Sequence, residues 1–264
     1  MVIAADTKCM VARALICACA PLALLGACGG SSQPVKRADP IGPPYVRSAI
    51  VEQHDRQFAE DAPERPAGSQ AEGIAATYLL GHLQQAGYLV RLENVPVEDL
   101  VRSSNVTALP PDGGDASVIV AVAYDTPPSE AAGGEAIGTF LEVARAMRVI
   151  EPAHSFGFVG LGADNAALDP GRLGSRRLAR LLLDDELEPG IILIGETHAG
   201  ESLTLKGDLA PDLREAAKAA GVEASISTEP VDVFPTAGFT AAEMSGDALA
   251  LGRTLLEFLT KSGV

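Results

Sequence analysis

The chain contains 264 residues, of which 47% are hydrophobic and 21% are charged, with 35 Asp and Glu against 20 Lys and Arg. This composition excludes a disordered or collagen-like chain, and it suffices for one large domain with a buried core. The net charge of −15 repels phosphate backbones, and no cluster of Lys and Arg after residue 40 reverses it locally. No nucleic-acid partner is therefore expected.

The amino terminus, residues 1–27, has the pattern of a secretory signal peptide. Lys8 and Arg13 precede an apolar stretch that is shorter than the ~20 residues of a permanent membrane span. The stretch ends in Leu-Gly-Ala before Cys28, and Gly and Ser residues follow. This arrangement resembles a bacterial lipobox, in which Cys28 becomes the lipidated first residue of the mature protein. The alternative is an ordinary signal peptide that is cleaved nearby.

The rest of the chain divides into a tether and one domain. Residues 28–44 are rich in Gly, Ser and Pro, which is typical of a flexible spacer, and we expect residues 45–264 to form a single domain. The other three cysteines lie inside the predicted signal peptide, so a mature chain that begins at Cys28 has neither an internal disulfide nor Cys-ligated zinc. We expect an extracytoplasmic protein of the cell envelope, periplasmic or on the outer surface, with the membrane as its partner through the lipid.

Beyond residue 44, helical patterns alternate with short apolar runs. Helices are expected over 45–60, 69–87, 134–150, 172–183, 211–220 and 246–260, and strands over 88–93, 105–109, 117–123, 155–162, 190–195, 203–206 and 223–228, the last of the sheet. Several of the strands are almost continuously apolar, as strands are when helices cover both of their faces. The sequence therefore predicts an α/β fold, a three-layer α/β/α sandwich with a mostly parallel central sheet.

Polar side chains follow three of the buried strands. In a parallel sheet, ligands bind beyond the carboxyl ends of the strands, where the loops converge. The residues at these positions are Tyr124 and Asp125, then Asp164 and Asn165, then Glu196 and His198.

Short motifs around these positions occur in the order of a known family. They are Arg65-Pro66-Ala67-Gly68-Ser69, Ala86-Gly87-Tyr88, Ser104-Asn105-Val106, Ala123-Tyr124-Asp125-Thr126, the helix from Phe140 to Met147, the strand end from Phe158 to Asn165, and Leu173-Gly174-Ser175. In this series the chain resembles the di-zinc aminopeptidase family, the twenty-eighth family of metallopeptidases, whose relatives include glutaminyl cyclases. The resemblance implies the zinc aminopeptidase fold from about residue 65 to residue 196, with a weaker match beyond.

The resemblance also implies a site with two zinc ions, held by His and carboxylate ligands beside a Glu general base. This chain departs from that site at most positions. Ala123 stands where the first His ligand belongs, Asp164 replaces the general base, and Asn165 replaces the next Glu ligand. No acidic residue is in register with the bridging Asp, and no His occurs after residue 198. Glu196 stands where the family has Asp and could still bind a metal.

Two interpretations of the strand ends follow. In the first, Asp125, Asp164, Glu196 and His198 converge on an atypical single-metal site for Mg²⁺, Mn²⁺ or loosely held Zn²⁺, with Asp125 and Asp164 as catalytic groups and the other two as ligands. In the second, they are loop residues without a metal, with Asp125 capping the loop and Asp164 forming a turn with its own backbone. The second is favoured, because catalytic zinc typically needs three protein ligands.

The remaining histidines offer no ligands to this site. His54 and His82 are expected on helix surfaces, and His154 lies at the wrong end of its strand. The sequence also contains no Gly-x-Ser-x-Gly nucleophile motif, no phosphate-binding loop and no dinucleotide fingerprint.

The sequence thus predicts an extracytoplasmic lipoprotein of the aminopeptidase fold that is catalytically degenerate and binds peptides or envelope proteins. No cofactor is expected, or zinc if the family site is partly retained. Two alternatives stay open: an active metal-dependent aminopeptidase or cyclase with an atypical metal site, and a structural envelope lipoprotein.

Overall fold

The structure is a computed structural model that describes residues 42–98, 100–109, 115–150, 156–165, 168, 170–200 and 202–262. The predicted signal peptide, Cys28, most of the predicted tether and His154 lie outside the described residues, so lipidation and processing stay predictions. Within the described ranges, no helix is both long and apolar enough to cross a membrane.

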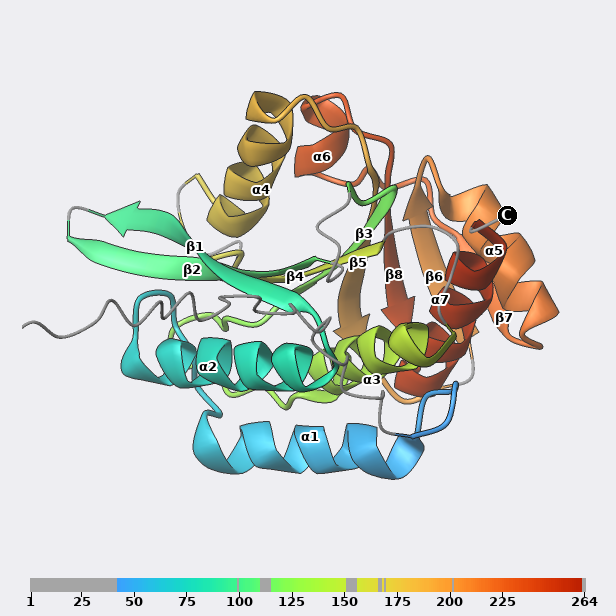
Figure 1. Cartoon of the computed structure of the whole chain (residues 1–264), viewed down its shortest axis with the longest axis horizontal. Helices are drawn as coiled ribbons and strands as arrows, with labels where there is room; N and C mark the ends of the chain where they lie inside the picture. The colour runs from blue at the N-terminus through green and yellow to red at the C-terminus, as the bar shows by residue number, and fades with distance from the viewer. Residues whose placement is uncertain are drawn as a thin grey trace, which may run out of the picture. The chain divides into compact units, whose positions relative to one another are not determined.

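An eight-stranded sheet in the order β1-β2-β4-β3-β5-β8-β6-β7 organises the domain (Figure 1). The strands are β1 Leu89–Glu98, β2 Val101–Leu109, β3 Val118–Ala123, β4 Phe156–Leu161, β5 Gly190–Thr197, β6 Ser202–Gly207, β7 Glu223–Ile226 and β8 Ala241–Gly246. The four central strands β4, β3, β5 and β8 run parallel, whereas β1 with β2, β2 with β4, and β6 with β8 pair antiparallel. The expected mostly parallel centre is confirmed.

Helices cover both faces of the sheet and complete the three layers. They are α1 Ser48–Asp61, α2 Gln70–Gln85, α3 Glu135–Ile150, α4 Leu173–Asp184, α5 Ala210–Ala219, α6 Val233–Thr236 and α7 Ala248–Ser262. Alternate residues of β3 point to opposite layers, because side chains alternate along a strand. Val118, Val120 and Val122 join the core formed with α2, α3, α5 and α7, whereas Ile119 and Ala121 join the core formed with α4 and α6. The predicted sandwich is confirmed.

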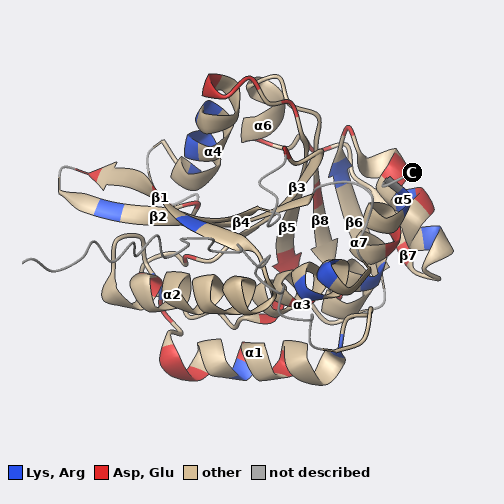
Figure 2. Cartoon of the chain, viewed as in Figure 1, with Lys and Arg blue, Asp and Glu red and all other residues tan. Residues whose placement is uncertain are grey.

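Charged side chains lie mainly on the helices, the loops and the outer strands (Figure 2). The four central strands carry only two charged residues, Glu196 near the end of β5 and Glu243 in β8. This distribution leaves apolar side chains on both faces of the central strands, and burial of that apolar surface holds the layers together.

Two elements near the carboxyl terminus were not predicted, namely α6 and β8, so the prediction that β7 is the last strand is wrong. The sequence of β8, Ala-Ala-Glu-Met-Ser-Gly, has few of the β-branched and aromatic residues that favour strands. It nevertheless pairs with β5 on one side and β6 on the other, with Ala241, Ala242 and Met244 buried. Its tertiary position overrides its weak strand propensity.

Ser69 and Glu72 at the start of α2 have the spacing of a capping box, but only one of its two hydrogen bonds forms. Ser69 caps the helix by accepting the backbone N–H of Glu72 at 3.1 Å. The carboxylate of Glu72 does not return to Ser69 but accepts the backbone N–H of Gly68, the hydroxyl of Ser103 and the backbone N–H of Ala163. Glu72 therefore ties α2 to β2 and to the end of β4.

The buried face of α2 combines large and small apolar residues. Leu79 and Leu83 are buried, whereas Ile74 is 45% exposed. Ala75 and Ala76 supply the rest of the buried face. These small residues allow α2 to pack closely on the sheet, so closely that a Cβ added at Gly160 of β4 would lie 2.9 Å from Leu79.

Close packing of α4 against the end of β4, where Gly174 meets Gly162, can be tested by substitution. A Cβ added at Gly174 would overlap the carbonyl oxygen of Gly162, a backbone atom that cannot rotate away. We expect Gly174→Ala to lower the free energy of unfolding by about 2–3 kcal/mol in denaturant titration. Gly81→Ala is the matched control: nothing lies within 4 Å of its Cβ position in α2, so this variant should gain up to about 1 kcal/mol. Equal effects of the two substitutions would contradict the packing argument.

Candidate functional site

Asp125 and Asp164 lie together at the carboxyl ends of β3 and β4. One carboxylate oxygen of Asp125 accepts the backbone N–H of Asp164 at 2.9 Å, and the other accepts the backbone N–H of Asn165 at 3.1 Å. The parallel pairing of β3 and β4, with Ala123 opposite Leu161, causes this approach. Asp125 therefore holds the loop that follows β4.

Asp164 is almost completely buried, with 1% of its surface exposed, and its oxygens are occupied. One oxygen accepts the backbone N–H of Ser175 at 2.7 Å, and the other accepts the hydroxyl of Ser175 at 3.0 Å and lies 3.5 Å from Nη1 of Arg172. These bonds join Asp164 to α4 and to the residue before it, and the expected turn of Asp164 with its own backbone would involve residue 166, which lies outside the described residues. Burial raises the pKa of Asp164, although the bonds from Ser175 and the charge of Arg172 oppose this shift.

The loop between β4 and α4 is fixed by its backbone conformation as well. Ala163 and Arg172, at its two ends, adopt left-handed conformations with φ of 50° and 57°. The backbone N–H of Leu173 donates to the carbonyl of Ala163 at 3.0 Å and joins these ends. Asp164 is thereby held against α4.

Asp125 has a pKa raised to about 7, mainly because burial penalises its charge, while its two backbone hydrogen bonds oppose the shift. The ordinary pKa of Asp is 3.8. Between these values the folded chain binds a proton that the unfolded chain has released, so this group makes the fold less stable as the pH rises from about 4 to about 7.

We therefore expect Asp125→Asn to remove part of the pH dependence of stability. The free energy of unfolding of the wild type, relative to the variant, should fall by about 1–3 kcal/mol between pH 5 and pH 8. Urea titrations at these two pH values measure the difference. A difference between the two proteins that does not change with pH would contradict the raised pKa.

Glu196 and His198 lie beyond Ile194 of β5 and are both exposed. The backbone N–H of His198 donates to the carbonyl of Gly246, and its ring lies near the carbonyl of Ala199. Across the described ranges, no three side chains of His, Cys, Asp or Glu are close enough together to hold a metal ion. The structure thus brings Asp125 and Asp164 together, and does not join Glu196 and His198 to them in one group.

The residues present do not fit the two zinc ions of the resembled site. Ala123 ends β3 with a methyl group, which cannot bind a metal. Both oxygens of Asp125 accept backbone N–H groups, and both oxygens of Asp164 are bonded to Ser175. No zinc-dependent step is therefore derived for this chain.

Arg65 is a structural centre of this region to which the sequence assigned no function. Its guanidinium is buried and donates to the carbonyl oxygens of Tyr124, Ala62, Ala132 and Gly133 at 2.6–3.2 Å. Its backbone N–H also donates to the hydroxyl of Thr126. The Arg-x-x-Gly-Ser motif was the signal, and its first residue joins the loop between α1 and α2 to the loop between β3 and α3.

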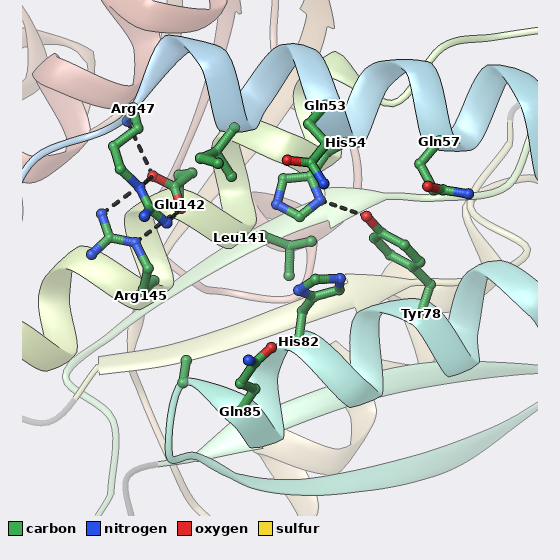
Figure 3. Close-up of a pocket in the computed structure, with 12 residues that line it drawn as sticks. Arg47, Gln53, His54, Gln57, Tyr78, His82, Gln85, Leu141, Glu142 and Arg145 are labelled. Carbon is green, nitrogen blue, oxygen red and sulfur yellow. Dashed lines mark hydrogen bonds and ion pairs between the residues drawn. The ribbon is translucent and has the colours of Figure 1, made fainter. Parts of the chain in front are cut away.

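His54 corrects another prediction, because it is 5% exposed and not a surface residue. It lies on the same face of α1 as Val51 and Phe58, a spacing of three and four residues that indicates a buried helix face. His82 of α2 is half-buried, and the two imidazole rings are 4.8 Å apart between centroids. These rings, with Tyr78 and Glu142, line a second pocket (Figure 3).

No protein-family model matches the chain, and no curated protein matches its sequence. Solved structures do match its fold, with TM-scores of 0.66 for a putative Zn-dependent exopeptidase from Bacteroides vulgatus and 0.69 for a leucine aminopeptidase precursor from Bacteroides thetaiotaomicron. They are 18% and 16% identical to this chain, and each match covers 83% of this chain and 98% of the other.

A glutaminyl cyclase from Bacteroides thetaiotaomicron, bound to N-acetylhistamine, matches equally well, with a TM-score of 0.69, 16% identity, and coverage of 83% of this chain and 99% of that one. The chain therefore has the fold that Zn-dependent exopeptidases, aminopeptidases and glutaminyl cyclases share. The resemblance read from the motifs is confirmed at the level of the fold.

Proposed function

We propose that this chain is a catalytically degenerate protein of the zinc aminopeptidase fold that binds peptides or unstructured segments of envelope proteins at the carboxyl ends of its central strands. Its amino terminus would hold it to a membrane through a lipid on Cys28. The proposal rests mainly on the burial and bonding of Asp164, which stands at the position of the family's general base. Asp164 is buried and bonded to Ser175 and Arg172.

The surroundings of Asp164 support a binding role over a catalytic one. A general base must lie within hydrogen-bond reach of the proton that it removes, and a displacement of ~1 Å can lower a rate by about 10²-fold. Asp164 is one methylene shorter than the Glu that it replaces, and both of its oxygens already have donors. Asp125, its neighbour, holds the same loop.

The strand ends nevertheless keep exposed groups that a peptide could contact. Glu196 carries an exposed carboxylate, which suits the charged amino terminus of a peptide, and His198 lies two residues further along. Solved structures of the same fold include a leucine aminopeptidase precursor and a glutaminyl cyclase bound to a small ligand, so the fold itself accommodates ligands.

Fluorescence anisotropy of labelled peptides tests the binding role. We expect a set of mixed-sequence peptides with free amino termini to bind more tightly than the same peptides acetylated at the amino terminus. The double variant Glu196→Lys/His198→Glu should weaken binding at least tenfold, while Glu223→Lys, an exposed change on β7, should leave it unchanged. Absence of binding by every peptide would instead favour the structural lipoprotein, which needs only a tether and a stable domain.

A further inference from the structure

A second polar pocket, of about 360 Å³, lies among α1, α2 and α3 (Figure 3). Its lining includes no residue of the strand-end region described above. Two imidazole rings face each other in it, His54 from α1 and His82 from α2, and Tyr78 of α2 lies beside both. Histidines from two different helices thus meet in one solvent-connected cavity.

The distance between the two rings suits two ligands of a single ion. Their centroids are 4.8 Å apart and their planes are 86° apart, and Figure 3 shows both rings in the pocket between α1 and α2. A metal ion lies about 2.0–2.1 Å from each imidazole nitrogen and therefore about 3.2 Å from each ring centroid. Two such rings at coordination angles of about 90–109° have centroids about 4.5–5.2 Å apart, a range that includes the observed distance.

The hydrogen bond of His54 leaves its other nitrogen available. Nδ1 of His54 lies 2.7 Å from the hydroxyl of Tyr78. When Nδ1–H donates to that oxygen, Nε2 keeps its lone pair, and metal-binding histidines commonly have such a partner on the second nitrogen. In the part of the chain that the structure describes, neither Nε2 of His54 nor either ring nitrogen of His82 has a hydrogen-bond partner.

Burial acts on the pKa of both rings in the same direction. It lowers the pKa of His54 to about 4, with a further contribution from His82, and it lowers the pKa of His82 as well.

The chemistry of the lining selects the kind of ion. Glu142 also lines the pocket, but its carboxylate is bonded to Arg47 and Arg145 and is therefore not an available ligand. Imidazole donors without carboxylates suit Cu²⁺, Ni²⁺ and Zn²⁺, whereas Mg²⁺ and Ca²⁺ need oxygen ligands. Among these ions Cu²⁺ forms the most stable complexes.

We propose that His54 and His82 together bind one divalent transition-metal ion, Cu²⁺ most tightly, through one nitrogen of each ring. Water would complete the coordination, and the cavity volume has room for it. The site is independent of peptide binding at the strand ends, because it lies on other elements.

Titration of the purified protein with CuSO₄, followed by calorimetry and by electron paramagnetic resonance, tests the proposal. We expect one Cu²⁺ per chain, with hyperfine splitting from two imidazole nitrogens, and no heat of binding with MgCl₂. His82→Gln should raise the Kd for Cu²⁺ at least tenfold, and the spectrum of this variant should show splitting from one imidazole nitrogen only. His198→Gln removes an exposed histidine from the strand ends and should change neither the Kd nor the spectrum.

Tyr78→Phe gives a second test that keeps both ligands. It removes the hydrogen-bond partner of His54, and we expect about 10–100-fold weaker binding with two nitrogens still coordinated. Circular dichroism confirms that each variant is folded before titration. Wild-type affinity in folded His82→Gln, or loss of the two-nitrogen spectrum in His198→Gln, would overturn the proposal.

Discussion

Replacement of Glu142 by Gln should lower the free energy of unfolding by about 3–5 kcal/mol, the cost of breaking a buried ion pair on one side. Glu142 of α3 is 2% exposed, and its two oxygens accept the backbone N–H, Nε and Nη2 of Arg47 as well as Nε and Nη2 of Arg145. A neutral amide would leave two guanidinium groups facing each other without a counter-charge.

The charged triad of Arg47, Glu142 and Arg145 also fixes the segment that precedes α1. The guanidinium of Arg145 donates to the carbonyl oxygens of Pro43 and Tyr45, at 2.8 Å and 2.7 Å. The loss of Glu142 should therefore expose this segment to protease. Asp184→Asn, in the exposed pair with Arg180, is the control and should change stability by less than about 0.5 kcal/mol, since such pairs contribute little. Similar losses of stability in Glu142→Gln and Asp184→Asn would contradict the large contribution of the triad to the stability of the fold.

The effect of Glu142→Gln should also depend on pH. Burial raises the pKa of Glu142, but the hydrogen bonds from Arg47 and Arg145 outweigh it and lower the pKa to about 2. The ionised carboxylate thus stabilises the fold fully above its ordinary pKa of 4.5, and this contribution is lost as the pH falls toward 2. Urea titrations should show a smaller difference between wild type and variant at pH 3 than at pH 7.

Replacement of Arg65 by Met should cost a comparable amount, about 3–5 kcal/mol, because four carbonyl oxygens lose a charged donor in a buried site. The pKa of Arg65 is lowered to about 10, chiefly by burial, so the side chain stays charged at neutral pH. Its guanidinium also lies 5.1 Å from the centre of the Phe58 ring. Thermal unfolding and denaturant titration measure the loss.

Two further substitutions define what Arg65 contributes. Arg65→Lys should recover only part of the loss, because an ammonium group cannot reproduce the planar arrangement of guanidinium donors. Arg176→Met, an exposed change on α4, should stay within about 0.5 kcal/mol of the wild type. Full recovery by Lys would show that charge alone, and not the geometry of the donors, holds the loop after α1 against the loop after β3.

The central strands were predictable because burial on both faces leaves a strong sequence signal. Val118–Ala123 and Phe156–Leu161 are continuous apolar runs, and the structure places them at the centre of the sheet. β8 was not predictable in the same way. Its small residues fit between β5 and β6 for tertiary reasons, and Ala241 and Ala242 carry no local signal for a strand.

The position of the candidate site was predictable in part, and its internal bonding was not. The rule that loops converge at the carboxyl ends of parallel strands correctly joined Asp125 to Asp164. The bonds of Asp164 to Ser175 depend on the left-handed residues of the intervening loop, and single-residue conformations of this kind are not encoded by periodicity. The pocket of His54 was missed because a histidine on the buried face of α1 resembles a surface residue when composition alone is considered.

The rate of hydrolysis of aminoacyl anilides, measured with zinc present for the wild type and for Asp164→Ala, tests the central claim most directly. The buried and fully bonded state of Asp164 predicts no hydrolysis above the rate in buffer for either protein. Hydrolysis by the pure wild type that is lost in Asp164→Ala would contradict the account and establish a working enzyme.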